Sequence, residues 1–286
     1  MESETRSERT AKKGTLIVKD VMTILKENIS HFGMTYRIAK YEDKASYQSH
    51  YLGMIWQYLN PAIQVGVYFL VFGMGLRASS AKAGVPYIVW MLVGIVPWFF
   101  MSSSILGTSR SIFSKIGIVS KMKFPISILP TVNIVSNFTA YLAMMAIVLI
   151  SLFANHVPVT IYWWQFIYYF ICMMALLFSL GILNSTISVL IRDYHVALQS
   201  LMRLLFYLSG PIIDITQGSF PPLLQKIFGL NPLAYVISGF RDTFIYNKWF
   251  FDAPVDMLYF WCFVALVLII GSHLHMRFRS RFVDFV

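Results

Sequence analysis

Long charge-free stretches, separated by short polar or charged segments, make up most of this chain. The stretches that lack Asp, Glu, Lys and Arg cover residues 45–76, 83–109, 124–191, 194–202, 204–213 and, with Asp256 as the single exception, 253–276. A helix needs about 20 apolar residues to cross the hydrocarbon core of a membrane, so the stretch 124–191 is long enough to cross it twice. The pattern therefore predicts an all-α integral membrane protein with six transmembrane helices, over residues 54–76, 86–106, 126–154, 163–190, 196–215 and 257–276.

The composition agrees with a lipid environment, because 57% of the residues are hydrophobic and only 13% are charged. Most of the 23 lysines and arginines fall before the first predicted span, between the second and third, or after the last. The positive-inside rule then places both termini in the cytoplasm. We expect three parts: a cytoplasmic segment over 1–50, a membrane domain over 51–276 and a cytoplasmic tail over 277–286.

Apolar residues recur with a near-helical period ahead of the first span. They are Val18, Val21, Met22, Leu25, Ile29 and Phe32, with Lys19, Lys26 and Glu27 elsewhere on the helical wheel. This pattern predicts an amphipathic helix on the inner membrane surface. A helix packed against soluble protein is the alternative.

The predicted outer segment before the last span is too apolar to be a solvated loop. It reads "SFPPLLQKIFGLNPLAYVISGFRDTFIYNKWFF" and is broken by Pro221, Pro222, Gly229 and Pro232. Irregular backbone at membrane depth must be buried in protein, so we expect short re-entrant outer helices within 217–250, with the prolines at plausible helix starts.

Four basic residues and no acidic one occur in "SRSIFSKIGIVSKMKFP", residues 109–125. On a helix, one face would carry Ile112, Phe113, Ile116 and Val119, and the opposite face Arg110, Ser114, Gly117 and Lys121. An apolar stripe of this length favours docking to a partner. A cytoplasmic loop whose lysines only follow the positive-inside rule is the alternative.

Motifs for nucleotide or metal chemistry do not occur in the sequence. Because there is no GxxxxGK[ST] loop, we do not expect this chain to hydrolyse ATP alone. His273 and His275 are two residues apart on a predicted helix and point to different faces, which is a poor spacing for a metal site. We expect no catalytic residue, metal or cofactor in this chain.

Arg203 stands in the middle of the fifth predicted span. An arginine that faces lipid there costs several kcal/mol, and the residues one turn away, Gln199 and Tyr207, are not acids. We expect Arg203 to face a cavity, a partner or a polyanionic substrate, or else to bond with backbone carbonyls.

Three sequence blocks resemble the ABC-2 type membrane subunits of bacterial polysaccharide exporters, and among these most of all the permeases for wall teichoic acid. The blocks are "YLGMIWQYLNPAIQVGVYFLVFGMGLR" at 51–77, "GIVPWFFMSSSILGTSRSIFSKIGIVSKMKFPISILP" at 94–130 and "NPLAYVISGFRDTF" at 231–244. The resemblance extends over about residues 15–280. It implies a homodimer in the bacterial plasma membrane with two separate cytoplasmic ATPases, which carry the ATP and Mg²⁺, and no nucleic-acid partner.

The resemblance also implies roles for particular residues. An interfacial helix over 16–34 and a cytoplasmic coupling helix over 109–123 would meet the ATPases, and the coupling candidates are Arg110, Ile112, Phe113, Lys115, Ile116, Val119 and Lys121. The substrate-path candidates are Trp56, Tyr58, Tyr68, Phe72, Arg203 and Tyr207. Arg241 and Asp242 belong to the outer re-entrant region, where a guanidinium would suit phosphate contacts.

The polymer implied is a lipid-diphosphate-linked, anionic wall teichoic acid, moved from the cytoplasmic to the outer face. An O-antigen or capsular polysaccharide exporter shares all three blocks and is the alternative. A more distant alternative is an outward-facing glycan ligase or transferase, with Asp214, Asp242, Asp252 and Asp256 as acids and bases. An ion-coupled transporter would place acids within its spans, and none lies near the centre of a predicted span.

Overall fold

The computed structural model describes residues 17–47, 51–68, 70–71, 81–82, 84–115, 117, 125–212, 221 and 228–282. One helix covers residues 17–30. The others are α2 (Phe32–Tyr47), α3 (Trp56–Tyr68), α4 (Tyr87–Arg110), α6 (Leu129–Ala154), α7 (Phe166–Leu190), α8 (Tyr194–Leu208), α10 (Pro232–Arg241) and α11 (Pro254–Phe278). Two short strands, β1 (Ala81–Lys82) and β2 (Val85–Pro86), pair antiparallel. The predicted all-α class is therefore confirmed.

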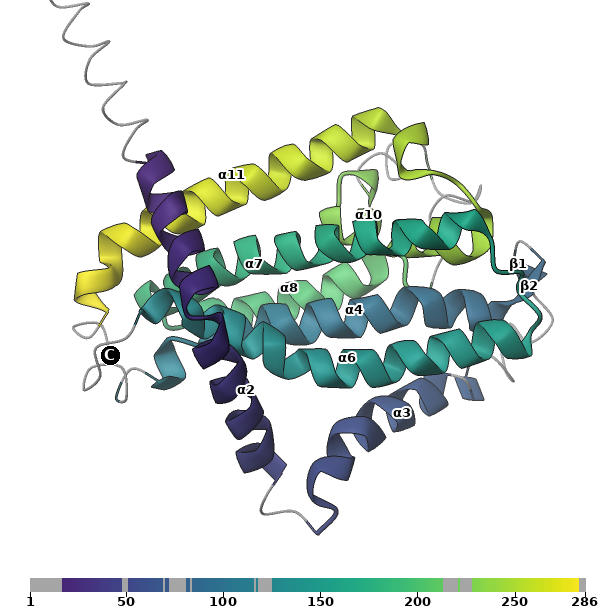
Figure 1. Ribbon diagram of the computed structural model, residues 1–286, viewed down its shortest axis with the longest axis horizontal. Helices are drawn as coiled ribbons and strands as arrows, with labels where there is room; N and C mark the ends of the chain where they lie inside the picture. The colour runs from purple at the N-terminus through teal and green to yellow at the C-terminus, as the bar shows by residue number, and fades with distance from the viewer. Residues whose placement is uncertain are drawn as a thin grey trace, which may run out of the picture.

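Five helices, α4, α6, α7, α8 and α11, run along the long axis of the molecule (Figure 1). Helix α4 lies at the centre, because it packs against α6, α7, α8 and α10. It carries no charged residue before Arg110 and is apolar on all sides, as expected of a helix buried on every face. Helix α11 packs on α7 at the edge of this bundle.

Four of these helices are long and apolar enough to cross a membrane: Tyr87–Arg110, Ile126–Ala154, Ile161–Leu190 and Pro254–Phe278. They match four of the six predicted spans. Helices α3 and α8 cover parts of the other two, of which residues 69, 72–76 and 213–215 lie outside the described residues. The integral membrane class is confirmed, and the count of six stays a prediction.

One end of the bundle holds the end of α4, the α7–α8 turn and the end of α11, and following the predicted orientation we call it the inner end. Ile112, Leu129, Val189 and Phe282 form a buried apolar cluster there, so the chain is packed closely where these segments meet. The opposite end, which carries β1, β2 and α10, is the outer end (Figure 1).

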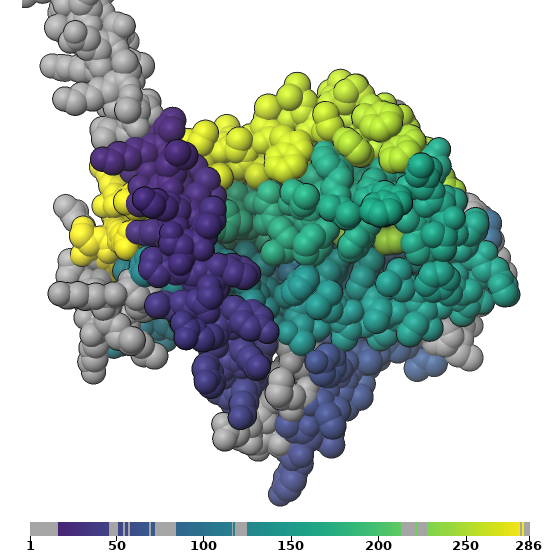
Figure 2. All heavy atoms as spheres, in the orientation of Figure 1, coloured from purple at the N-terminus to yellow at the C-terminus, as the bar shows by residue number. Residues whose placement is uncertain are grey.

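The two amino-terminal helices cross the inner part of the bundle and form a ridge on its surface (Figure 2). Their inward face is small and partly polar and consists of Ile24, Asn28, Thr35 and Ala39, each buried. Four residues of the predicted apolar stripe, Val18, Met22, Ile29 and Phe32, point away from the bundle and are more than half exposed, while Val21 and Leu25 are half-buried. This orientation leaves the stripe available to a membrane surface or to another protein.

Hydrogen bonds and ion pairs fasten this ridge to the inner end. Glu27 Oε1 accepts from Arg279 Nη1 at 2.6 Å, and Glu27 also accepts from the Ser127 hydroxyl. Asp20 pairs with His273 at 3.0 Å. The amino-terminal helices and the end of α11 therefore form one unit.

Helix α10 begins at a proline, as the sequence predicts. Pro232 is its first residue, and the Asn231 side chain caps it by accepting from the Leu233 N–H at 3.0 Å. The helix continues into a π-helical turn, Asp242–Tyr246, and packs against α4, α7 and α11. Residues 217–220 and 222–227 of the predicted re-entrant region lie outside the described residues, and its depth in the membrane stays a prediction.

Candidate functional site

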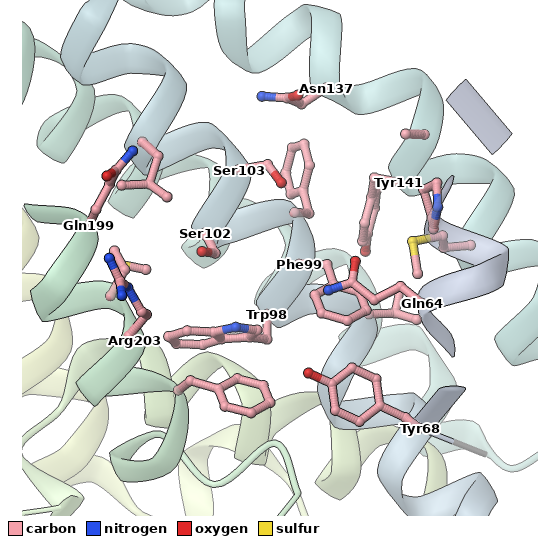
Figure 3. Close-up of a pocket in the computed structure, with 18 of the residues that line it drawn as sticks. Gln64, Tyr68, Trp98, Phe99, Ser102, Ser103, Asn137, Tyr141, Gln199 and Arg203 are labelled. Carbon is pink, nitrogen blue, oxygen red and sulfur yellow. The ribbon is translucent and has the colours of Figure 1, made fainter. Parts of the chain in front are cut away.

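A cavity of about 620 Å³ lies between α3, α4, α6 and α8. Figure 3 shows Gln64 and Tyr68 of α3, Trp98, Phe99, Ser102 and Ser103 of α4, Asn137 and Tyr141 of α6, and Gln199 and Arg203 of α8 around it. Helices that correspond to four of the predicted spans thus meet at one site. Its volume lies within the range of ordinary small-molecule pockets.

Aromatic rings form much of its wall. Tyr68 lies 6.0 Å from Phe99 and 6.1 Å from Phe206 between ring centroids, and Phe206 lies 5.6 Å from Trp98. This network joins α3, α4 and α8 at tilted angles that aromatic pairs favour. It presents both ring faces and ring edges to the cavity.

The polar side chains of the cavity are almost all neutral: Gln64, Ser102, Ser103, Asn137 and Gln199. Arg203 is the one charged residue among the described lining residues. The Tyr141 hydroxyl is buried and has no hydrogen-bond partner within the described part of the chain. A buried hydroxyl without a hydrogen-bond partner destabilises the folded chain. A ligand that offered this hydroxyl a donor or an acceptor would therefore bind favourably beside it.

Arg203 is exposed on α8, and no hydrogen bond or ion pair joins its side chain to another described residue. Its guanidinium lies at the cavity edge beside Gln199 (Figure 3). Of the alternatives expected for Arg203, a cavity agrees with this placement, and a bond to described backbone carbonyls does not. Such a group is available for an anion, and guanidinium binds phosphate through paired hydrogen bonds.

Three predicted path residues, Tyr68, Arg203 and Tyr207, line the cavity. Trp56 and Tyr58 lie earlier on α3 and do not line it. Phe72 lies outside the described residues. The site therefore brings together half of the predicted path.

The contribution of α4 and α6 to this cavity was not predicted from the sequence. Ser102 and Ser103 on α4 and Asn137 on α6 all line the cavity. Polar residues within an apolar span were the available signal, because a span tolerates them mainly where they face protein or water.

A chain of polar contacts runs from the cavity toward the inner end. Gln199 Nε2 lies 3.0 Å from His195 Nε2, and His195 Nδ1 lies 2.7 Å from Ser109 Oγ. Burial, and then the nearby Arg110 guanidinium, lower the pKa of His195. Ser109 is the first residue of the predicted coupling segment, so one imidazole links that segment to the cavity wall.

The predicted coupling helix over 109–123 is not continuous in the described residues. Helix α4 ends at Arg110, and a 3₁₀ turn follows at Phe113–Lys115. Ile112 is wholly buried in the inner cluster, so the prediction that it lies on an exposed docking stripe is wrong. Ile116, Val119 and Lys121 lie outside the described residues.

Other members of the coupling set are accessible. Arg110 and Phe113 are exposed. Lys115 Nζ pairs with Glu42 Oε1 of α2 at 2.5 Å, which joins this segment to the amino-terminal ridge. The predicted coupling segment is therefore in direct contact with α2, at a residue that follows the predicted interfacial helix 16–34.

The expectation that the Arg241 guanidinium suits phosphate contacts is wrong. Its guanidinium is buried and donates to the carbonyls of Gly210 and Pro211, each at 2.8 Å, and to that of Trp90 at 3.4 Å. It also lies over the Trp90 ring, 3.4 Å from the centroid. Arg241 thus joins the end of α8 to α4 and is not available as a phosphate ligand.

The neighbouring Asp242 is placed differently. Its side chain lines a second cavity at the outer end.

Comparisons with known proteins place the chain in a family. The family model for the ABC-2 type transporter matches residues 35–245. The O-antigen export system permease protein RfbA of Klebsiella pneumoniae is 24% identical, over 91% of this chain and 98% of that relative. RfbA of Myxococcus xanthus is 23% identical, over 80% of this chain and 86% of its own length. The inner membrane transport permease YadH of Escherichia coli K12 is 26% identical, over 65% of this chain and 74% of its own.

These matches confirm the family resemblance read from the three sequence blocks, and the four long apolar helices agree with it. Because the family model covers more than half of the residues, this chain belongs to the ABC-2 type transporter family and is an integral membrane permease.

Proposed function

We propose that this chain is the membrane subunit of an ATP-driven exporter that moves a lipid-linked polysaccharide from the cytoplasmic to the outer face of the plasma membrane. Two copies form the pathway, and two separate ATPase subunits bind ATP and Mg²⁺ at the inner end. Family membership and relatives named as O-antigen export permeases support this proposal.

The observation that carries the proposal is the chemistry of the cavity between α3, α4, α6 and α8. Aromatic rings such as Tyr68 and Trp98 offer flat apolar faces, and neutral groups such as Ser103 and Asn137 offer hydrogen bonds. A sugar ring has apolar C–H faces and a rim of hydroxyls, so it matches both kinds of surface. The exposed Arg203 suits the diphosphate that joins the glycan to its lipid.

The same chemistry favours a polysaccharide of the O-antigen class over wall teichoic acid. A polyol phosphate carries one negative charge in every unit, and several such charges would occupy an apolar cavity together. Burying unpaired anions is costly, and Arg203 is the single cation among the described lining residues. The names of the relatives point the same way.

The inner end supplies the surface for the ATPases. Phe113 and Arg110 are exposed there, and the Glu42–Lys115 pair connects them to the amino-terminal ridge. The apolar stripe of that ridge, Val18, Met22, Ile29 and Phe32, lies in the inner leaflet surface in this proposal.

Reconstitution tests the proposal. The full chain and its cognate ATPase are placed in proteoliposomes with ATPase subunits outward, together with lipid-linked polysaccharide from cells that carry this system. We expect ATP to protect the polymer from added glycosidase as it enters the lumen, and an ATPase subunit with a replaced phosphate-loop lysine to abolish protection. Polymer that stays accessible with the active complex would contradict the proposal.

A second substrate decides the polymer class. Lipid-linked poly(glycerol phosphate) is tested in the same vesicles, with periodate-accessible ends as the readout of its side of the membrane. We expect at least tenfold slower entry than for the neutral polysaccharide. Equal or faster entry would favour teichoic acid instead.

A further inference from the structure

A second cavity, of about 670 Å³, lies at the outer end of the bundle. It is bounded by α10, by the π-helical turn Asp242–Tyr246 and by the segment 248–256 that leads into α11. It shares no described lining residue with the first cavity. Asp252, Asp256 and Lys248 are exposed, so this outer cavity opens to the surface.

The lining combines aromatic rings with carboxylates. Tyr169, Tyr235, Tyr246 and Trp249 supply rings from α7, α10 and the segments that follow it. Asp242, Asp252 and Asp256 supply carboxylates. Carboxylate oxygens accept hydrogen bonds strongly, and aromatic faces attract C–H edges, so the cavity offers complementary groups to a polyhydroxylated ring.

The charge balance of the outer cavity argues against an anionic ligand. Arg241 lines it, but its guanidinium is bonded to the carbonyls of Trp90, Gly210 and Pro211. Lys248 is then the one other cation among the described lining residues, against three carboxylates. With Arg241 counted, the lining still has more carboxylates than cations, which disfavours a phosphate-rich segment.

The carboxylates are also not arranged for a metal ion. Within the described residues, no group of three or more His, Cys, Asp or Glu side chains could hold one. Asp252 Oδ2 accepts from the Trp249 N–H at 3.0 Å, which fixes it at a different point of the wall from Asp256 on α11. Acceptors spread around a cavity fit an organic ligand with several hydroxyls.

Residues 248–250, which line the outer cavity, are held in place by contacts within the chain itself. Gln165 Nε2 donates to the Lys248 carbonyl at 2.6 Å, and Gln165 Oε1 accepts from the Phe250 N–H at 3.0 Å. The Phe250 ring stacks on Tyr168 with 4.1 Å between centroids. A wall fixed in this way loses little entropy on binding, which favours affinity.

We infer that the outer cavity of each chain binds a neutral sugar unit of the polymer after it has crossed the membrane. This inference rests on the proposed function and adds a binding site that the transport cavity does not provide. The aromatic rings hold the sugar faces, and Asp242, Asp252 and Asp256 accept hydrogen bonds from its hydroxyls. The site delays backward sliding of the chain between transport cycles.

Photocrosslinking in exporting cells tests the inference whatever the identity of the sugar. The photoreactive amino acid p-benzoylphenylalanine replaces Lys248. The exposed Lys248 side chain lines the cavity, whereas the hydrogen bond from Gln165 that holds this wall goes to the Lys248 backbone carbonyl and is kept in the variant. The matched control carries it in place of Leu266, an exposed residue of α11 that does not line the cavity. After irradiation the purified chain is labelled at vicinal diols and analysed by mass spectrometry.

We expect a glycan adduct at position 248 at least fivefold above that at 266, composed of sugars without phosphate. Asp256→Asn is expected to lower the yield at least threefold, and Asp193→Asn, at the inner α7–α8 turn, to leave it unchanged. Equal adducts at both positions in cells that export polymer would overturn the inference while the proposed function stands. An adduct of polyol phosphate would overturn the neutral class, and absence of export would refute the proposed function instead.

Discussion

His195 at the start of α8 is hydrogen-bonded to Ser109 in the last turn of α4, with 2.7 Å between Nδ1 and Oγ. Ser109 already donates its own proton to the Leu106 carbonyl at 2.7 Å, so the imidazole Nδ1–H is the donor to Ser109. Nε2 is then the acceptor for the Gln199 amide at 3.0 Å. A neutral imidazole therefore links the cavity helix α8 to the helix that leads into the coupling segment.

Removing the acceptor of that imidazole should weaken the fold. Ser109→Ala leaves the buried His195 N–H without a partner, and we expect the free energy of unfolding to fall by about 1–3 kcal/mol. Thermal unfolding of the purified chain in detergent measures the change. The control is Ser200→Ala, because Ser200 is exposed and its hydroxyl bonds only the Val196 carbonyl. Equal melting temperatures for both variants would contradict the prediction.

The same imidazole makes stability depend on pH. Burial lowers the pKa of His195 from its usual 6.5, so below that pH the unfolded chain binds a proton that the folded chain does not. The stability that is fully present above pH 6.5 is therefore expected to fall as the solution is acidified. Melting temperatures at pH 7.5 and 5.5 measure this. His195→Gln should reduce the difference, and His156→Gln, at the exposed α6–α7 turn, should not.

Arg241 is expected to stabilise the outer end through its carbonyl bonds. Arg241→Ala leaves the carbonyls of Gly210 and Pro211 unpaired, and we expect a loss of about 3 kcal/mol. Gly94→Ala is expected to destabilise too, since a Cβ there would clash with the Arg241 guanidinium. In the double variant the clash has disappeared, so the two losses should not add. Additive losses in thermal unfolding would show that the two positions are independent.

Arg203 is expected to act in transport and not in folding. Because its side chain has no described partner, Arg203→Ala should leave the free energy of unfolding within about 0.5 kcal/mol of the wild-type value. Polymer entry into proteoliposomes should fall at least tenfold. Arg192→Ala, at the exposed inner turn, is the matched control. Unchanged transport by Arg203→Ala would exclude a phosphate contact at this site.

The Glu42–Lys115 pair is expected to transmit movement between the ridge and the coupling segment. Lys115→Glu replaces this ion pair, 2.5 Å between Nζ and Oε1, by two acidic side chains that repel each other, and should reduce polymer moved per ATP hydrolysed severalfold. Glu42→Lys combined with Lys115→Glu restores opposite charges and should recover most of the coupling. Failure of the double variant, with both proteins folded, would show that Lys115 acts through another contact.

The sequence by itself determined the membrane class, the positions of four spans and the family. These properties depend on local composition and period, because a bilayer requires a long apolar helix wherever the chain crosses it. The helix start at Pro232 is a property of the same kind, since proline fixes its own backbone angle. Arg203 could be assigned to a position away from lipid because facing lipid would be costly, but not to the cavity in particular.

Only the tertiary structure decided how side chains from distant segments are used. Arg241 and Arg203 look alike in sequence, yet one is bonded to carbonyls from residues 210 and 211 and the other lies at the cavity edge. Ile112 shares an apolar pattern with Phe113, but Phe282 and Val189 bury it. Such roles depend on which groups the packing brings within a few ångströms, and no local pattern along the chain contains that information.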